Sequence, residues 1–176
     1  MQIGHRLSID IDLFSLETFN TEKTLEYLEN KYQFILNYKS KNSLKGEIRK
    51  VKVDLITHQY PLTDELIVFD SIRMAPLKEI SAMKLNAIMV NGTRLKDFID
   101  IAFLSNFLRL NDMLEAYEFK YSTRNPVMVT KSLTYFDDIN YDEPIILINE
   151  KYDWIKVEMR LKTMVSNPNK IFNKKI

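Results

Sequence analysis

Three aspartates in the first third of the chain stand where carboxylates could bind a metal ion. The segment from residue 8 reads Ser-Ile-Asp-Ile-Asp, which sets Asp10 and Asp12 two positions apart between isoleucines. In a β-strand such residues lie on one face, about 6.5 Å from each other, so both carboxylates are expected to point the same way. Asp54, in "VKVDLI", is expected on the polar face of a further strand. Three carboxylates could converge on one or two cations about 4 Å apart, the spacing used in two-metal phosphoryl transfer.

The available ligand atoms favour magnesium over zinc. The chain has no cysteine and two histidines, so disulfides, zinc-thiolate sites and cysteine nucleophiles are excluded. Magnesium prefers hard oxygen ligands and keeps water or substrate phosphates on its remaining positions. An isolated S-x-D-x-D segment is also typical of the solvated side of a surface strand, and at this point both interpretations stand.

A second set of charged residues lies within apolar helical segments. Lys84 falls on or beside the packing stripe of residues 76–90. It is either a lysine whose stem covers the rim of the core while its amine reaches water, or a cation that binds phosphate. Asp97 and Asp100 are three apart and share a face of the next helix. Lys96 could form a plain intrahelical ion pair with Asp100, but apolar neighbours crowd Asp100 and favour a site role.

Composition narrows the classes of protein and partner. The 176 residues, 45% of them hydrophobic, suffice for one globular domain, and 25 basic against 24 acidic residues argue against a broad basic surface for nucleic acid. Only three glycines occur, too far apart for a P-loop or a dinucleotide-binding turn. No signal peptide or membrane-length apolar run is present, so we expect a cytoplasmic protein without membrane contacts.

Hydrophobic periodicity predicts an α+β fold in a single domain, 1–176, with a strand-rich part (1–75) and a mainly helical part (76–176). The expected strands are 6–14, a hairpin followed by a strand through Val51, Val53 and Leu55, and short pieces at 66–69, 72–74 and 145–148. The expected helices are 21 to the low thirties, 76–90, 94–109, 112–121, 126–135 and 153–164. The tail after residue 165 is expected to fray.

Four segments together resemble a known family. "IGHRLSIDIDLFS", "VKVDLI", "IRMAPLKEISAMKLNAI" and "KDFIDIAFL", with "KSLTYFDD" behind them, are similar in order and spacing to the AbiEii-type (AbiEii/AbiGii toxin-like) nucleotidyltransferases of the polymerase-beta-like superfamily. The resemblance covers roughly residues 3 to 148. It implies a nucleotidyltransferase-like mixed sheet in the N-terminal half and a helical C-terminal half, in agreement with the periodicity.

The resemblance also implies roles for individual residues. Asp10 and Asp12 match the metal-binding D-x-D pair, and Ser8 of the same motif is assigned to nucleotide binding. Asp54 matches the third carboxylate and the base for an acceptor hydroxyl. Lys84 matches the lysine that contacts nucleotide phosphates. Asp97 and Asp100, assigned to nucleotide binding, match the K/R-D-x-x-D element.

The implied reaction transfers a nucleoside monophosphate from a nucleoside triphosphate to a hydroxyl, possibly of RNA, with Mg²⁺ as cofactor. The family belongs to bacterial toxin-antitoxin and phage-defence systems, which implies a cognate antitoxin protein as partner.

Two departures keep alternatives open. The family pattern carries a Gly-Gly-Thr or Gly-Ser segment upstream of the D-x-D pair, and this chain begins too late to contain it. A non-catalytic or truncated family member acting as a binding or regulatory component is therefore the alternative function, and a generic ligand-binding α+β domain is a third.

The second departure lies in "VNGTRLK", where either Asn91 or Arg94 stands near a position at which the family often has arginine. His5 is interpreted as a loop or strand-end residue, and an uncovered sheet edge near residue 1 suggests a possible homodimer.

Overall fold

The chain folds into two compact units. The computed structural model describes residues 2–8, 10–122, 125–148, 151–173 and 176. Residues 8–60 form one unit, here called the sheet unit. Residues 1–7 and 61–176 form the other, here called the helical unit.

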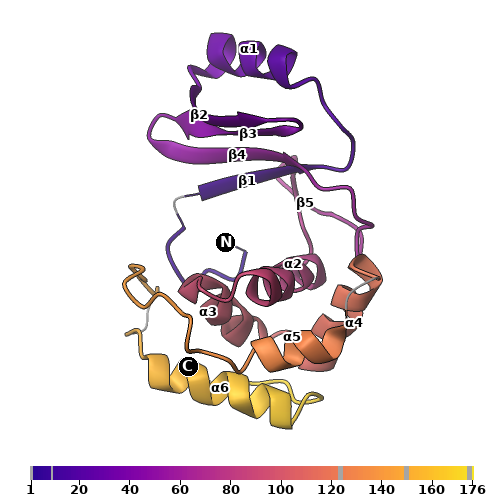
Figure 1. The fold of residues 1–176 in the computed structure, drawn as a ribbon, viewed down its shortest axis with the longest axis vertical. Helices are drawn as coiled ribbons and strands as arrows, with labels where there is room; N and C mark the ends of the chain where they lie inside the picture. Colours follow the sequence, from indigo (N-terminus) through magenta and orange to yellow (C-terminus); the bar gives the residue numbers. More distant parts are fainter. Residues whose placement is uncertain (1, 9, 123–124, 149–150, 174–175) are drawn as a thin grey trace. The chain divides into compact units, whose positions relative to one another are not determined.

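The sheet unit is a four-stranded mixed sheet with one helix on one face (Figure 1). The strand order is β1-β4-β3-β2; β1 and β4 run parallel, and the other neighbours are antiparallel. The elements are β1 (Asp10–Ser15), α1 (Thr21–Tyr32), β2 (Ile35–Ser40), β3 (Ser43–Ile48) and β4 (Val51–Thr57).

Local chemistry explains where these elements begin and end. The Asn20 side chain caps α1 by accepting from the Lys23 amide, and Gln33 ends the helix in the left-handed conformation. Arg49 and Lys50 both have positive φ, which suits the tight turn between β3 and β4. The small core of this unit, beneath α1, consists of Leu25, Leu28, Phe34, Leu44 and Val53.

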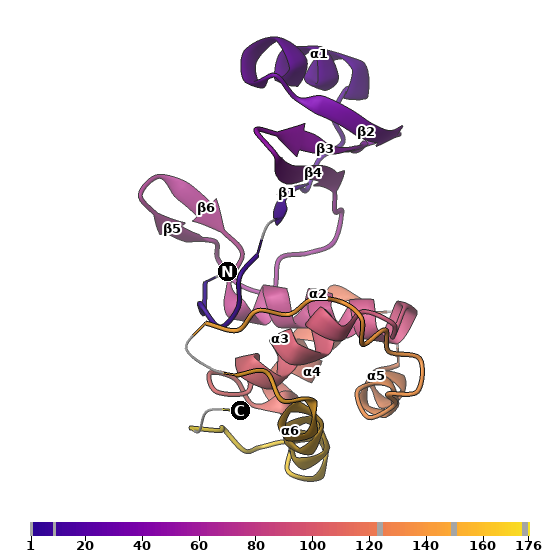
Figure 2. The same cartoon turned by 90° about the vertical axis from the view of Figure 1, so that its left-hand side faces the viewer.

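The helical unit is built around α3 (Leu95–Leu104), in which every residue except Lys96 is buried. α3 lies between α2 (Leu77–Val90) and α6 (Trp154–Ser166) (Figures 1 and 2). The remaining helices, α4 (Leu110–Lys120) and α5 (Pro126–Ser132), pack on α2. A short hairpin, β5 (Ile67–Phe69) and β6 (Ile72–Met74), precedes α2 and extends away from the helices in Figure 2.

The predicted α+β fold is confirmed: the described strands end at Met74, and every described helix except α1 follows it. The strand predicted over 6–14 was placed too early, because β1 begins at Asp10. Residues 5–7 instead bond to residues 146–148, with the Leu7 amide 3.0 Å from the Ile146 oxygen and the Ile148 amide 2.8 Å from the His5 oxygen.

Other boundaries also differ from the sequence prediction. The segment 145–148, predicted as a strand, makes a single antiparallel bridge with Arg6. The helix predicted over 94–109 ends at Leu104, and the next begins at Leu110. The tail does not simply fray, because Phe172 and Ile176 are buried in the helical core. No helix in the described part of the chain combines the length and apolarity needed to cross a membrane.

Candidate functional site

The three predicted metal-binding aspartates lie on neighbouring strands of the sheet unit. In the parallel pairing of β1 with β4, Asp12 stands directly opposite Asp54, and Asp10 stands opposite Lys52. Adjacent strands are about 4.8 Å apart, so Asp12 and Asp54 are cross-strand neighbours. Because side chains alternate along a strand, Asp10, Asp12 and Asp54 share one face of the sheet.

That face is the one opposite α1. Val53, which precedes Asp54, belongs to the core beneath the helix. Successive side chains of a strand point to opposite faces, so the Asp54 side chain points away from α1. There Lys45 of β3 stands opposite Asp54 in the register, and its Nζ lies 2.9 Å from Asp54 Oδ2. Both side chains are partly exposed, so water screens this ion pair. Ser8, the other predicted residue of this motif, is exposed and lies before β1.

The donor chemistry of this face suits Mg²⁺. Carboxylate oxygens are the hard ligands that the ion prefers, and two of the three carboxylates are register neighbours. Within the described residues, no three histidine, aspartate or glutamate side chains are already gathered as a metal site. Binding would therefore require rotation of exposed side chains, and Lys45 would compete for Asp54.

The helical unit holds a second group of charges, here called the Lys84 cluster: His5, Arg6, Lys84, Arg94, Asp97 and Asp100. Lys84 Nζ, on α2, lies 2.6 Å from Asp97 Oδ1 and 2.8 Å from Asp100 Oδ2, both on α3. The Lys84 side chain is 22% exposed, whereas the two carboxylates are buried. The Lys84 ammonium is thus held by two buried carboxylates at the edge of the unit.

Asp100 is the most fully bonded member of the cluster. Arg6 donates to it through two nitrogens, Nε to Oδ1 at 2.7 Å and Nη2 to Oδ2 at 2.9 Å. His5 Nε2 lies 2.9 Å from Oδ1, and because an ionised carboxylate only accepts, the histidine donates. Burial by itself would raise the pKa of Asp100, but hydrogen bonds from His5 and Arg6 and the charge of Lys84 hold it well below its usual range.

The two cations bonded to Asp100 are held in their charged forms. Burial opposes the charge of Lys84, but Asp100 and Asp97 outweigh it and raise the lysine pKa. The pKa of Arg6 is raised in the same way, by its bonds to Asp100 against the cost of burial. Arg94 is more loosely attached: its Nε is 3.3 Å from Asp97 Oδ2, and its side chain is 47% exposed.

Sequence reasoning missed the part played by the residues before the D-x-D motif. His5 is buried, stacks on Phe103 with ring centroids 4.6 Å apart and bonds to a helix 95 positions away. Arg6 was not singled out. The signal that could have found it was Asp100 itself, a carboxylate among apolar helix neighbours, which needs cationic donors from elsewhere in the chain.

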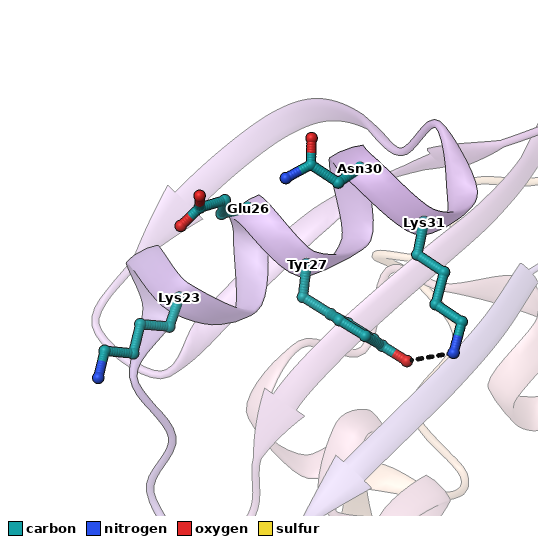
Figure 3. Close-up of a pocket in the computed structure, with 5 residues that line it drawn as sticks. All are labelled: Lys23, Glu26, Tyr27, Asn30 and Lys31. Atoms are coloured by element: carbon teal, nitrogen blue, oxygen red, sulfur yellow. Dashed lines mark hydrogen bonds between the residues drawn. The ribbon is translucent and has the colours of Figure 1, made fainter.

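A surface pocket on α1 contains none of the predicted site residues. Its lining residues all come from this one helix: Lys23, Glu26, Tyr27, Asn30 and Lys31 (Figure 3). Lys31 Nζ donates to the Tyr27 hydroxyl at 2.9 Å, which lowers the pKa of that exposed tyrosine. Because this pocket is open and lined by a single helix, it does not enclose a ligand.

Comparison with known proteins agrees with this architecture. The crystal structure of JHP933 from Helicobacter pylori has the same fold, with a TM-score of 0.50 over 92% of this chain and 75% of that one, at 19% sequence identity. The family model described as nucleotidyl transferase AbiEii toxin, Type IV TA system, matches residues 32–156. The chain therefore belongs to the AbiEii nucleotidyl transferase toxin family. No curated protein sequence matches it.

The family match divides the predicted site residues. It includes Asp54 and the helical-unit residues Lys84, Asp97 and Asp100, whereas Asp10 and Asp12 precede it. Asp12 is connected to the matched region through the structure, because the pairing of β1 with β4 sets it beside Asp54.

Proposed function

We propose that this chain is a Mg²⁺-dependent nucleotidyltransferase of a toxin-antitoxin system, which transfers a nucleoside monophosphate from a nucleoside triphosphate to a hydroxyl of RNA. The observation that carries the proposal is the cross-strand pairing of Asp12 with Asp54 in a chain of the AbiEii family. A cognate antitoxin is the partner that the family description suggests.

Asp10, Asp12 and Asp54 would hold the metal through their carboxylate oxygens. When bound, Mg²⁺ supplies positive charge that offsets the triphosphate and the leaving pyrophosphate. Asp54 would also accept the proton of the acceptor hydroxyl. The hydroxyl oxygen then bonds to the α-phosphorus, the bond from that phosphorus to the bridging oxygen breaks, and pyrophosphate leaves with its electron pair.

Lys84 would bind nucleotide phosphate in its own unit. Its ammonium has three donor hydrogens, and the carboxylates of Asp97 and Asp100 take two of them. The partly exposed ammonium can direct its third hydrogen to a phosphate oxygen. Asp100 is too deeply buried to reach a ligand in the described arrangement, so its contribution to nucleotide binding would be to hold Lys84.

The direct test uses purified chain, each of the four α-³²P-labelled nucleoside triphosphates, Mg²⁺ and total RNA, with products separated on a gel. We expect label on RNA that EDTA abolishes. Replacing Asp12 or Asp54 by asparagine should reduce transfer at least 100-fold, whereas Glu29→Gln, an exposed carboxylate change on α1, should leave it unchanged.

Two results would count against the proposal. Transfer that survives both aspartate substitutions would remove the assigned carboxylates from the reaction. No transfer with any triphosphate, together with weak or absent triphosphate binding by calorimetry in the presence of Mg²⁺, would favour a non-catalytic binding or regulatory component instead.

A further inference from the structure

The charges of the Lys84 cluster do not cancel. Arg6, Lys84 and Arg94 supply three cations, and Asp97 and Asp100 supply two carboxylates. These five groups therefore carry one surplus positive charge. A net positive charge at this position would attract a phosphate anion.

Arg6 is the source of that surplus. Its guanidinium meets the Asp100 carboxylate through two parallel bonds of 2.7 and 2.9 Å, the fork geometry in which arginine pairs most strongly with a carboxylate. The Arg6 side chain is only 10% exposed, so this pair is shielded from salt and water. Without Arg6, Lys84 would be the remaining lysine or arginine paired with Asp100 among the described residues, and its ammonium would share Asp97 with Arg94.

His5 fixes the direction of the same carboxylate. Its ring is stacked on Phe103, and Nε2 donates to Asp100 Oδ1, the oxygen that also accepts from Arg6 Nε. Nδ1 has no hydrogen-bond partner among the described atoms. The histidine therefore adds a hydrogen-bond donor to Asp100.

We infer that Arg6 is a positioning residue that neutralises Asp100, and thereby leaves the charge and third donor of Lys84 available to a phosphate anion. The inference rests on the proposed role of Lys84 in phosphate binding. It assigns to Arg6 an electrostatic task that does not require Arg6 to touch the ligand.

The test measures the affinity of the full chain for inorganic pyrophosphate, without metal and at low ionic strength, by calorimetry. Arg6→Gln leaves two cations against two carboxylates and should bind pyrophosphate about tenfold more weakly. Asp100→Asn leaves three cations against one carboxylate and should bind at least as tightly as the wild type. The double variant R6Q/D100N restores the surplus of one charge and should return to within about threefold of the wild type.

Controls separate this electrostatic role from a purely structural one. Arg6→Lys keeps the charge but loses the fork, and should retain most of the affinity. Arg109→Gln, a change at an exposed arginine with a loose ion pair to Asp112, is the matched control and should have no effect. Urea unfolding of every variant shows whether it is folded under the binding conditions.

The outcomes distinguish this inference from the proposed reaction. If both single variants weaken binding and the double variant is weaker still, Arg6 acts only through stability and the inference is overturned. If wild-type chain binds pyrophosphate with the expected variant order but transfers no nucleotide, the inference stands and the transfer reaction fails. If the wild type does not bind pyrophosphate, both this inference and the phosphate-binding role of Lys84 are overturned.

Discussion

If Asp12 is a metal ligand, Mg²⁺ should reverse which protein is more stable, the wild type or Asp12→Asn. Asp12 and Asp54 face each other across a strand pair, about 5 Å apart by strand spacing. Two unit charges at this distance in water repel by about 0.8 kcal/mol, and screening at 0.15 M salt leaves about half. Without Mg²⁺, Asp12→Asn should therefore stabilise the sheet unit by up to about 0.4 kcal/mol, with Lys45 offsetting part of the repulsion.

Magnesium should invert this ranking. At a concentration ten times its dissociation constant, a ligand that binds only the folded state stabilises it by about 1.4 kcal/mol. The wild type should show this gain, whereas the variant, which lacks one carboxylate ligand, should gain much less. The wild type should then be the more stable protein by about 1 kcal/mol.

Hydrogen exchange of the β4 amides, measured by NMR with and without Mg²⁺, reports on the sheet unit itself. Val53 and Leu55 lie in this strand, which is paired on both sides. Glu29→Gln is the control and should follow the wild type at every Mg²⁺ concentration. An equal gain from Mg²⁺ in Asp12→Asn and wild type would refute the assignment of Asp12 as a ligand.

Three further changes test the helical core and the sheet. Because the pKa of Asp100 is lowered in the folded chain, its stabilising contribution is present above the ordinary carboxyl pKa of about 4 and is lost as the pH falls from there toward the lower folded value. Urea unfolding from pH 6 to pH 3 should therefore show the first part of this decline in the wild type and a smaller decline in Asp100→Asn. Lys120→Met leaves buried Glu79 without its ion-pair partner and should cost about 3 kcal/mol in the same assay at pH 7; an unchanged unfolding midpoint would contradict it. Gly46→Ala directs a methyl group into the Ile35 carbonyl and the Phe34 ring and should cost about 1–3 kcal/mol, visible as a lower melting temperature.

Several features of the fold followed from short stretches of sequence. The Leu25 and Leu28 spacing predicted α1, and the apolar alternation of residues 51–55 predicted β4, because both patterns report which side of a local element is buried. The shared face of Asp10 and Asp12 followed from the two-residue period of a strand. These are local regularities that need no knowledge of distant partners.

The strand predicted over 6–14 shows where local pattern is insufficient. Alternation runs through this whole stretch, yet residues 5–7 belong to the helical unit and only Asp10–Ser15 pairs with β4. The difference arises from the buried Asp100 carboxylate, which needs donors and obtains them from His5 and Arg6. A buried charge without donors costs far more than the strand hydrogen bonds that this segment gives up.

The sequence by itself determined the order of strands and helices. It also showed that aspartates lie on strands and that Lys84, Asp97 and Asp100 lie in apolar helical segments. Only the tertiary structure decided that Asp12 stands beside Asp54 and that Arg6, 94 positions away, neutralises Asp100. Side-chain periodicity is written into neighbouring residues, whereas strand register and the pairing of buried charges depend on which distant segments the core brings together.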